Sequence, residues 1–399
     1  MSVRDEELRE ALNRPSPYGP DLDLSSYLPE AGEKPEEPGQ EVSSVGIDPR
    51  GEGRAGSFVQ VDHSALYARI QKMYEDSVEI LSFEDAVKRY DWLQEYVWKA
   101  VSPTADKYTA FTALKGKGGY FIRVLEGKEV VLPLQACLYV RTRNLLQAVH
   151  NLILMERDSS AQLLTGCLTH PQVERGFHIG ISEFYLKRGS KLTFTMVHHW
   201  GPKVDVRPRT GVVMEDESTF VSNYIALTPV ASLQAYPRVR MMGKKASATL
   251  NSIVYGRGSS QYDLGGWIEM MGSSNKGEIV GRTVTAEESR VLMRARLTSL
   301  GKDNVGHVEC NGLMLSPQSE ISAVPELVSR SSTSTLTHEA AVGKLNEEQV
   351  LYLMSRGLGR KEAEDLLIRG FLDVRILKLP EFLQQQVERI VQLAMGRGL

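Results

Sequence analysis

The middle of the chain alternates apolar and polar residues with a period of two, which is the pattern of half-buried β-strands. The alternation extends over about residues 111–327, with clear runs beginning at Lys191, Thr219 and Thr249. A polar turn precedes each run. The small residues of these turns recur at a near-constant interval, at Ala161, Ser190, Ser218, Ser247 and Gly277. Such regular spacing predicts a β-solenoid, in which each coil stacks on the one before.

A Greek-key sandwich also has short strands separated by turns, but at shorter spacings. We therefore predict a mainly β fold with flanking helices, built on a parallel β-helix core over residues 111–335. Residues 1–110 form an N-terminal arm and helical region, and residues 336–399 form a C-terminal helical domain. Residues one coil apart in such a core lie about 4.8 Å from each other.

The flanking segments carry other patterns. Residues 14–56 are rich in Pro, Gly and Glu, so we expect a largely extended or mobile arm. Apolar positions in residues 64–100 predict two amphipathic helices, broken near Ser82 and Phe83. Near the other end, Asn346 is a candidate N-cap and Gly357 a candidate stop. A second helix over residues 361–368 and a third beginning at Pro380 follow.

Charge and cysteine content narrow the function classes. A formal net charge of −3 over 399 residues gives no general attraction to nucleic acid or to an anionic membrane surface. The three cysteines, Cys137, Cys167 and Cys310, are too few for a disulfide framework. The acidic start M-S-V-R-D-E-E-L-R-E lacks the basic and apolar regions of a signal peptide. We expect a soluble cytoplasmic protein that binds neither nucleic acid nor membrane.

Cys310 and the adjacent pair His338 and Glu339 are the strongest candidates for chemistry. The separation of Glu339 from Cys310 equals the interval of the repeat, so we expect Glu339 beside Cys310 one coil later. Neighbouring strand residues point to opposite faces, so His338 would approach from the rim. A thiolate, a carboxylate and an imidazole together suit a transition metal, and the thiolate favours iron–sulfur or zinc. One cysteine is too few for a closed site, so the site is either open and labile or completed by a second subunit.

Other interpretations of the same residues stay open. Cys310 with His338 as base could serve nucleophilic catalysis, although nothing supplies an oxyanion hole or substrate pocket. Cys137 and Cys167 fit core positions. His198 and His199 follow one another on a strand, so we expect one to be buried and one exposed. No phosphate-binding loop or dinucleotide fingerprint is present, so a bound flavin is undecided.

The tract T-H-E-A-A-V-G-K-L-N-E-E-Q-V-L-Y-L-M-S-R-G-L beginning at Thr337 resembles the C-terminal signature of the SufB/SufD scaffold proteins of the SUF iron–sulfur cluster assembly system. The resemblance covers roughly residues 130–372 and includes V-L-P-L-Q-A at Val131, L-L-T-G-C at Leu163 and H-I-G-I-S-E-F at His178. It implies a right-handed parallel β-helix that dimerises through its end, and a C-terminal helical domain that docks an ABC-type ATPase, SufC. It also implies that Cys310, His338 and Glu339 serve nascent cluster assembly.

The resemblance favours a scaffold for a transient iron–sulfur cluster over an enzyme, with ATP hydrolysis left to the partner. Cys310 would bind iron or sulfide, Glu339 would be an exchangeable ligand, and His338 a ligand or proton acceptor. Met214 stands where many SufB-type members carry a further cysteine. The alternatives are a SufD-like structural partner and a β-solenoid enzyme acting through Glu339 or Cys310. The sulfur donor and the choice between a homodimer and a SufB–SufD heterodimer stay open.

Overall fold

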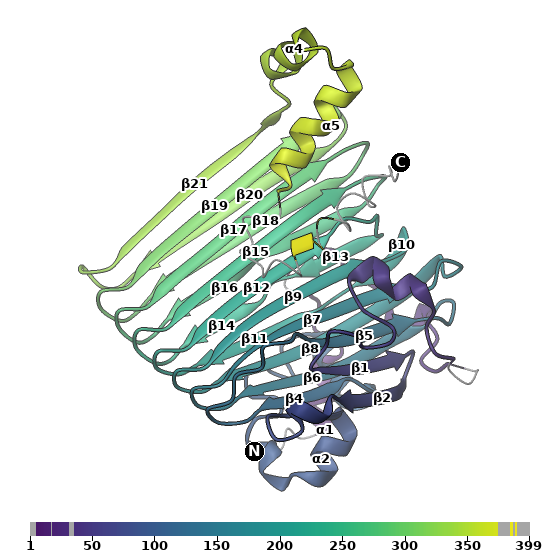
Figure 1. The fold of residues 1–399 in the computed structure, drawn as a ribbon, viewed down its shortest axis with the longest axis vertical. Coiled ribbons are helices and arrows are strands. Elements are labelled where there is room, and N and C mark those ends of the chain that lie inside the picture. Colours follow the sequence, from purple (N-terminus) through teal and green to yellow (C-terminus); the bar gives the residue numbers. More distant parts are fainter. Residues whose placement is uncertain (1–4, 17, 32–35, 374–383, 386–387, 389–399) are drawn as a thin grey trace.

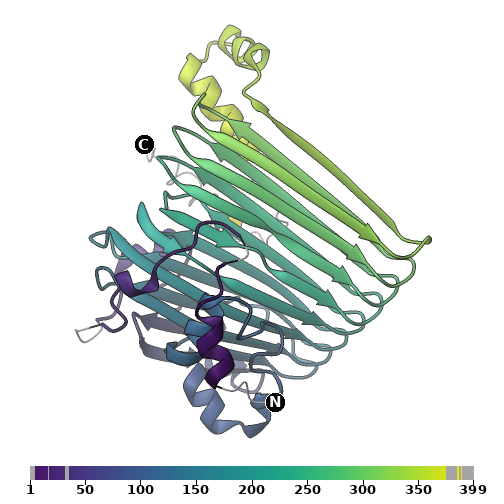
Figure 2. The same cartoon turned by 180° about the vertical axis from the view of Figure 1, so that it is seen from behind.

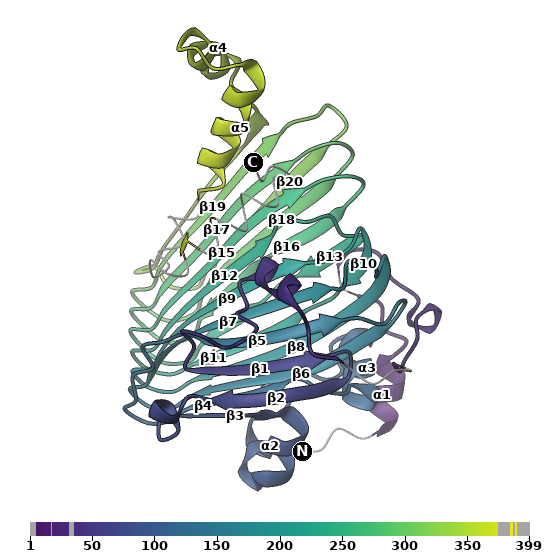
Figure 3. The same cartoon turned by 45° about the vertical axis from the view of Figure 1, so that its right-hand side comes forward.

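The chain forms a β-solenoid of about 8 turns with helices at both ends. A computed structural model describes residues 5–16, 18–31, 36–373, 384–385 and 388. Two sheets wind around a common interior, and successive strands stack from the N-terminal end to the C-terminal end (Figures 1 and 3). The predicted solenoid class is confirmed.

The first sheet has ten strands within the described residues. Apart from the antiparallel pair β1–β2, its neighbours run parallel, as the stacking of solenoid coils requires. In spatial order the strands are β2 (Ser64–Ile70), β1 (Gly56–Val61), β5 (Leu134–Val140), β7 (Ser160–Thr169), β9 (Lys191–His199), β12 (Thr219–Ala226), β15 (Ser247–Gly256), β17 (Lys276–Thr285), β19 (Val305–Met314) and β21 (Thr335–Lys344).

The second sheet has eleven strands in the same part of the chain and forms the opposite wall. Several of its coils use two short strands in place of one long strand. Its strands are β3 (Val78–Ser82), β4 (Tyr120–Val124), β6 (Leu146–Met155), β8 (Arg175–Leu186), β10 (Lys203–Val206), β11 (Arg209–Met214), β13 (Ser232–Ala235), β14 (Arg238–Met241), β16 (Gln261–Met270), β18 (Arg290–Ser299) and β20 (Glu320–Ser329).

The register gives the true length of each coil. From β9 onward the stacked residues form the ladder Lys191, Thr219, Ser247, Lys276, Val305 and Thr335, and the interval lengthens slightly toward the C-terminal end. The repeat expected from the turn residues is therefore nearly correct and drifts slightly out of register along the chain. Gly277, for example, pairs with Ala248 and not with Ser247.

The turns explain why small and polar residues recur. One residue per coil has a left-handed backbone just before a strand of the first sheet, at Asp158, Gly189, Glu217, Lys245, Ser274 and Asp303. Beyond it, the side chain of Asn275 accepts a hydrogen bond from the N–H of Ala246 (2.8 Å), and Asn304 accepts from the N–H of Asn275 (2.9 Å). These buried amides satisfy turn N–H groups that would otherwise lose water on folding.

The interior is apolar and aromatic. Phe184 packs against Phe194 and Phe220, with ring centroids 4.8 and 5.4 Å apart. Alternate residues of both sheets point into this space, and the intervening residues point outward. The outer face of the first sheet is covered near its N-terminal end by Val42, Val45 and Ile47 of the 3-10 helix η2 (Gln40–Val45) and the turn after it.

The segment 64–100 departs from expectation. The first predicted helix is instead strand β2, the 3-10 helix η3 (Lys72–Tyr74) and strand β3. Strand β2 pairs antiparallel with β1, so tertiary pairing overrides the helical spacing. A helix does begin at Phe83, where the Ser82 hydroxyl accepts from the Asp85 N–H (3.1 Å). It is short, α2 (Phe83–Arg89), and is followed by η4 (Asp91–Glu95).

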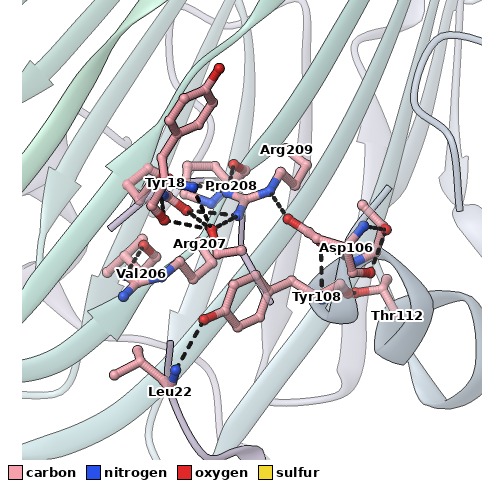
Figure 4. Close-up of polar contacts among 12 residues, drawn as sticks. Tyr18, Leu22, Asp106, Tyr108, Thr112, Val206, Arg207, Pro208 and Arg209 are labelled. Atoms are coloured by element: carbon pink, nitrogen blue, oxygen red, sulfur yellow. Dashed lines mark hydrogen bonds and ion pairs between the residues drawn. The ribbon is translucent and has the colours of Figure 1, made fainter. Parts of the chain in front are cut away.

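The N-terminal arm is held on the solenoid rather than projecting from it (Figure 2). Helix α1 (Asp5–Ala11) packs on α3 (Lys107–Lys115), and η1 (Leu24–Ser26) follows. Figure 4 shows that α3 joins the arm to the second sheet: the Leu22 N–H of the arm donates to the hydroxyl of Tyr108 on α3 (3.4 Å), and Arg209 on β11 donates to Asp106 at the start of α3 (2.7 Å). Buried and salt-bridged contacts of this kind make the arm part of the folded body.

Two helices follow the last coil. Helix α4 (Glu347–Ser355) begins after Asn346, whose side chain accepts a hydrogen bond from the Glu348 N–H (2.9 Å). Gly357, just beyond the end of the helix, has a left-handed backbone with φ +96°. The predicted cap and stop are confirmed. Helix α5 (Arg360–Phe371) comes next, and the predicted third helix from Pro380 lies outside the described residues. The predicted helical segment 336–399 instead begins with β21, because this tract pairs with β19. Among the described residues, no helix has the length and apolarity needed to cross a membrane.

Candidate functional site

Strands β19 and β21 bring the predicted site residues together at the C-terminal end of the solenoid. Cys310 pairs with Ala340, and Glu309 pairs with Glu339. The expected pairing of Cys310 with Glu339 is therefore wrong by one position. The coil that joins the two strands is one position longer than the repeat predicted, and a shift of one position exchanges the faces of a strand.

Cys310 points into the solenoid. Its side chain is 2% exposed and belongs to the interior cluster with Met293 and Val308. Small residues flank it on both neighbouring strands, Gly281 on β17 and Ala340 on β21. Burial raises the pKa of the Cys310 thiol to about 11, and the negative charge of Glu309 adds to this effect. The resting thiol is thus protonated at neutral pH and shielded from solvent.

His338 and Glu339 lie on opposite faces of β21. His338 pairs with Val308, so it shares the inner face with Cys310 and occupies the position diagonal to it. Both His338 and Glu339 are exposed. His338 is exposed although it faces inward, because no further coil follows β21 among the described residues. The imidazole of His338, and not the carboxylate of Glu339, therefore lies on the same face as the Cys310 thiol.

The outer face carries a group that the sequence reasoning did not single out. Three potential metal-ligand atoms lie within 4.8 Å of one another: one ring nitrogen of His307 and one carboxylate oxygen each of Glu309 and Glu339. His307 Nδ1 is 2.8 Å from the Thr337 hydroxyl, and the Asn311 amide donates to Glu309 (2.6 Å). The sequence did contain a signal for this group. His307 and Glu309 are two residues apart on one strand, as are Thr337 and Glu339 one coil later, so their side chains point to the same face.

The remaining candidates behave as structural residues. Cys137 and Cys167 are both fully buried, as expected for core positions. His198 is 3% exposed whereas His199 is exposed, so the predicted split of that pair is confirmed. Met214 is buried in the interior. Cys167 lines an internal cavity with Met196, His178 and His198, which lies several coils before Cys310.

A family model for the SUF system FeS cluster assembly, SufBD core domain, matches residues 138–371. The chain belongs to the SufBD family. A SufBD family protein of iron–sulfur cluster assembly from Methanothermobacter thermautotrophicus (strain Winter) is 40% identical over 399 residues, covering 96% of this chain and 97% of the relative. One from Archaeoglobus fulgidus is 39% identical over 355 residues, covering 89% and 94%. The SufB protein of Bacillus subtilis is 26% identical over 372 residues, covering 91% and 79%.

The SufBD core match includes β19, β21 and helices α4 and α5. The candidate residues Cys310, His338 and Glu339 therefore lie within the family domain rather than in an appended segment. The helices also reach back to the site: Arg282 on β17 donates to the carbonyl of Phe371 (3.2 Å) at the end of α5, and its other nitrogen lies 4.0 Å from Glu309.

Proposed function

We propose that this SufBD family protein is a scaffold on which nascent iron–sulfur clusters are assembled, and that it acts with an ABC-type ATPase of the SufC kind. Iron and sulfide are its cargo, and the chain itself catalyses no bond-making step. The observation that carries the proposal is Cys310, a single thiol at the last complete coil, with His338 on the same inner face.

The protonated and buried state of Cys310 suits a ligand that binds metal only when the interior of the solenoid opens. A thiol with a pKa of about 11 binds metal only when the ion displaces its proton, so loading must coincide with access to the interior. One thiolate with a single imidazole on the same face holds a cluster more weakly than four thiolates would. Weak ligation favours transfer of the finished cluster to an acceptor.

The open end of the solenoid supports completion of the site by a second subunit. Val291, Met293 and Leu297 of β18 are buried, whereas their inward-facing partners Ile321, Ala323 and Leu327 on β20 are partly exposed. Strands β20 and β21 each pair on one side only in the described part of the chain. Exposed inner faces and free strand edges favour pairing with another copy or with a SufD-like partner.

Helices α4 and α5 support docking of the ATPase. Helix α4 projects beyond the last coil, and α5 runs back from it to the first sheet, where Ile368 packs in a cluster with Val284 (Figure 1). Leu351, Tyr352 and Leu366 are 54%, 58% and 51% exposed, which is more apolar surface than two short helices leave to water without a partner. The contact of Arg282 with Phe371 and Glu309 offers a route by which movement of α5 reaches the strand that carries Cys310.

The test is anaerobic reconstitution with ferrous iron and sulfide, comparing the wild type with Cys310→Ser and with Cys137→Ser as a matched control. A broad absorption band at about 400 nm that is lost only in Cys310→Ser supports the scaffold. A colourless wild-type protein that still binds an ABC-type ATPase supports the SufD-like structural role instead. Absorption that survives in Cys310→Ser contradicts the role of this thiol.

A further inference from the structure

The outer face of β19 and β21 places two carboxylates side by side. Glu309 and Glu339 are directly paired across neighbouring parallel strands, which lie about 4.8 Å apart. Like charges directly opposite each other on a sheet are unfavourable unless a cation lies between them. His307 completes a group whose ligand atoms are all within 4.8 Å of one another.

Arg282 does not neutralise this group. It lies 4.0 Å from Glu309, a loose ion pair, and one of its other nitrogens is committed to the Phe371 carbonyl. In the described residues Glu339 has neither a hydrogen bond nor an ion pair. Glu278, the neighbour of His307 on β17, adds a further carboxylate to the same face. The three carboxylates of Glu278, Glu309 and Glu339 outnumber the single positive charge of Arg282, so this face has an excess of negative charge.

The surrounding residues orient the three side chains. The Thr337 hydroxyl can accept from His307 Nδ1, which leaves the lone pair on Nε2. The Asn311 amide donates to Glu309. Partners of this kind, outside the ligand set, are what fix imidazole and carboxylate ligands at metal sites. One imidazole and two carboxylates suit borderline and hard divalent ions such as Fe²⁺ and Mn²⁺, with water in the remaining positions.

We propose that His307, Glu309 and Glu339 form a binding site for one divalent transition-metal ion on the outer face of the solenoid, separate from the inward-facing Cys310. Ferrous iron is the cargo it would hold; that assignment rests on the proposed function, whereas divalent-cation binding itself does not. The outer site and Cys310 lie on opposite faces of β19. An ion bound at the outer site therefore lies beside the coil that must open before the ion can reach Cys310.

The experiment is titration of Mn²⁺ into the full chain, followed by the loss of the free-ion electron paramagnetic resonance signal. It is performed in the Cys310→Ser background, so that the outer site is measured without the thiol. We expect one bound ion per chain. His307→Ala and Glu339→Gln should each weaken binding by at least about tenfold. The matched control Glu320→Gln removes one exposed carboxylate from β20, on the opposite sheet, and should leave binding unchanged.

Absence of binding, equal weakening by Glu320→Gln, or unchanged binding in both site variants would overturn the proposal. Abolition of binding by Cys310→Ser, relative to the wild type, would overturn the separation of the two sites. Circular dichroism of each variant verifies the fold, and Glu339→Gln is nearly isosteric. Competition by Fe²⁺ under anaerobic conditions tests the cargo. Failure of cluster reconstitution with intact Mn²⁺ binding would count against the proposed function alone.

Discussion

Arg282 bridges the C-terminal end of helix α5 and the strand that carries Cys310, through the Phe371 carbonyl at 3.2 Å and the Glu309 carboxylate at 4.0 Å. These two contacts join a helix with exposed apolar residues to the residue that precedes the buried thiol. A partner that displaces α5 would therefore change the charge balance around Glu309.

Removal of the Arg282 charge should strengthen cation binding at the outer site. Arg282→Gln removes a positive charge near Glu309, so we expect the dissociation constant for Mn²⁺ to fall by about fivefold, a modest change because the pair is partly solvated. The control Arg290→Gln breaks a similar loose pair with Glu320 on the second sheet. Equal or weaker Mn²⁺ binding by Arg282→Gln would contradict the charge argument.

Alkylation of Cys310 in the native protein should depend steeply on pH. Because the thiol pKa is raised to about 11, the thiolate fraction rises about tenfold per pH unit from pH 7 to 10. Iodoacetamide labelling, mapped by peptide mass spectrometry, should follow this slope, whereas the denatured chain should level off at about pH 9. A plateau of the native rate at pH 8 to 9 would show that the thiol faces solvent.

The raised pKa of Cys310 also makes the free energy of unfolding depend on pH. The folded pKa of Cys310 lies above the unfolded value, so its contribution to the free energy of unfolding is present below about pH 9. That contribution is lost as the pH rises toward 11. Cys310→Ala should therefore show a smaller loss of stability between pH 9 and 11 than the wild type, measured by urea titration at each pH.

Glu183 should be the most sensitive carboxylate of the N-terminal half. It is fully buried, accepts from the Trp98 and Ala100 N–H groups (2.7 Å each), and lies 2.8 Å from His150 Nε2. Glu183→Gln should lower the free energy of unfolding by about 3 kcal/mol, because the amide NH2 replaces one of the two buried carboxylate oxygens and leaves a backbone N–H facing another donor. Glu174→Gln, at an exposed pair with Lys203, should cost less than about 1 kcal/mol. Equal effects in urea titrations would contradict this account.

Charges placed on the exposed apolar side chains of α4 and α5 should weaken ATPase docking. Leu351→Glu and Leu366→Glu are expected to reduce binding of a SufC-type ATPase by at least about tenfold, measured by isothermal titration calorimetry, because each would bury an unpaired carboxylate. Leu300→Glu, an exposed leucine after β18, is the matched control and should bind normally. Normal binding by both helix variants would place the docking surface elsewhere.

Local patterns predicted much of this fold correctly. The turn residues Ser190 and Ser218 lie immediately before strands of the first sheet, and the caps at Asn346 and Gly357 bound α4. Such features depend on the backbone chemistry of a few consecutive residues, which the sequence displays directly. The segment 64–82 was misread because Leu66 and Ile70 suit either a helix or a strand, and pairing with β1 decides between them.

The sequence by itself determined the solenoid, the approximate length of its coils, and the residue types gathered at its C-terminal end. Only the tertiary structure decided which of those residues share a face. A last coil one position longer than the repeat predicted sets Cys310 opposite Ala340, turns His338 toward the thiol side and sends Glu339 to the outer face with His307 and Glu309. Side chains on a strand alternate with a period of two, so a single extra position in a coil, which no local pattern specifies, exchanges the two faces.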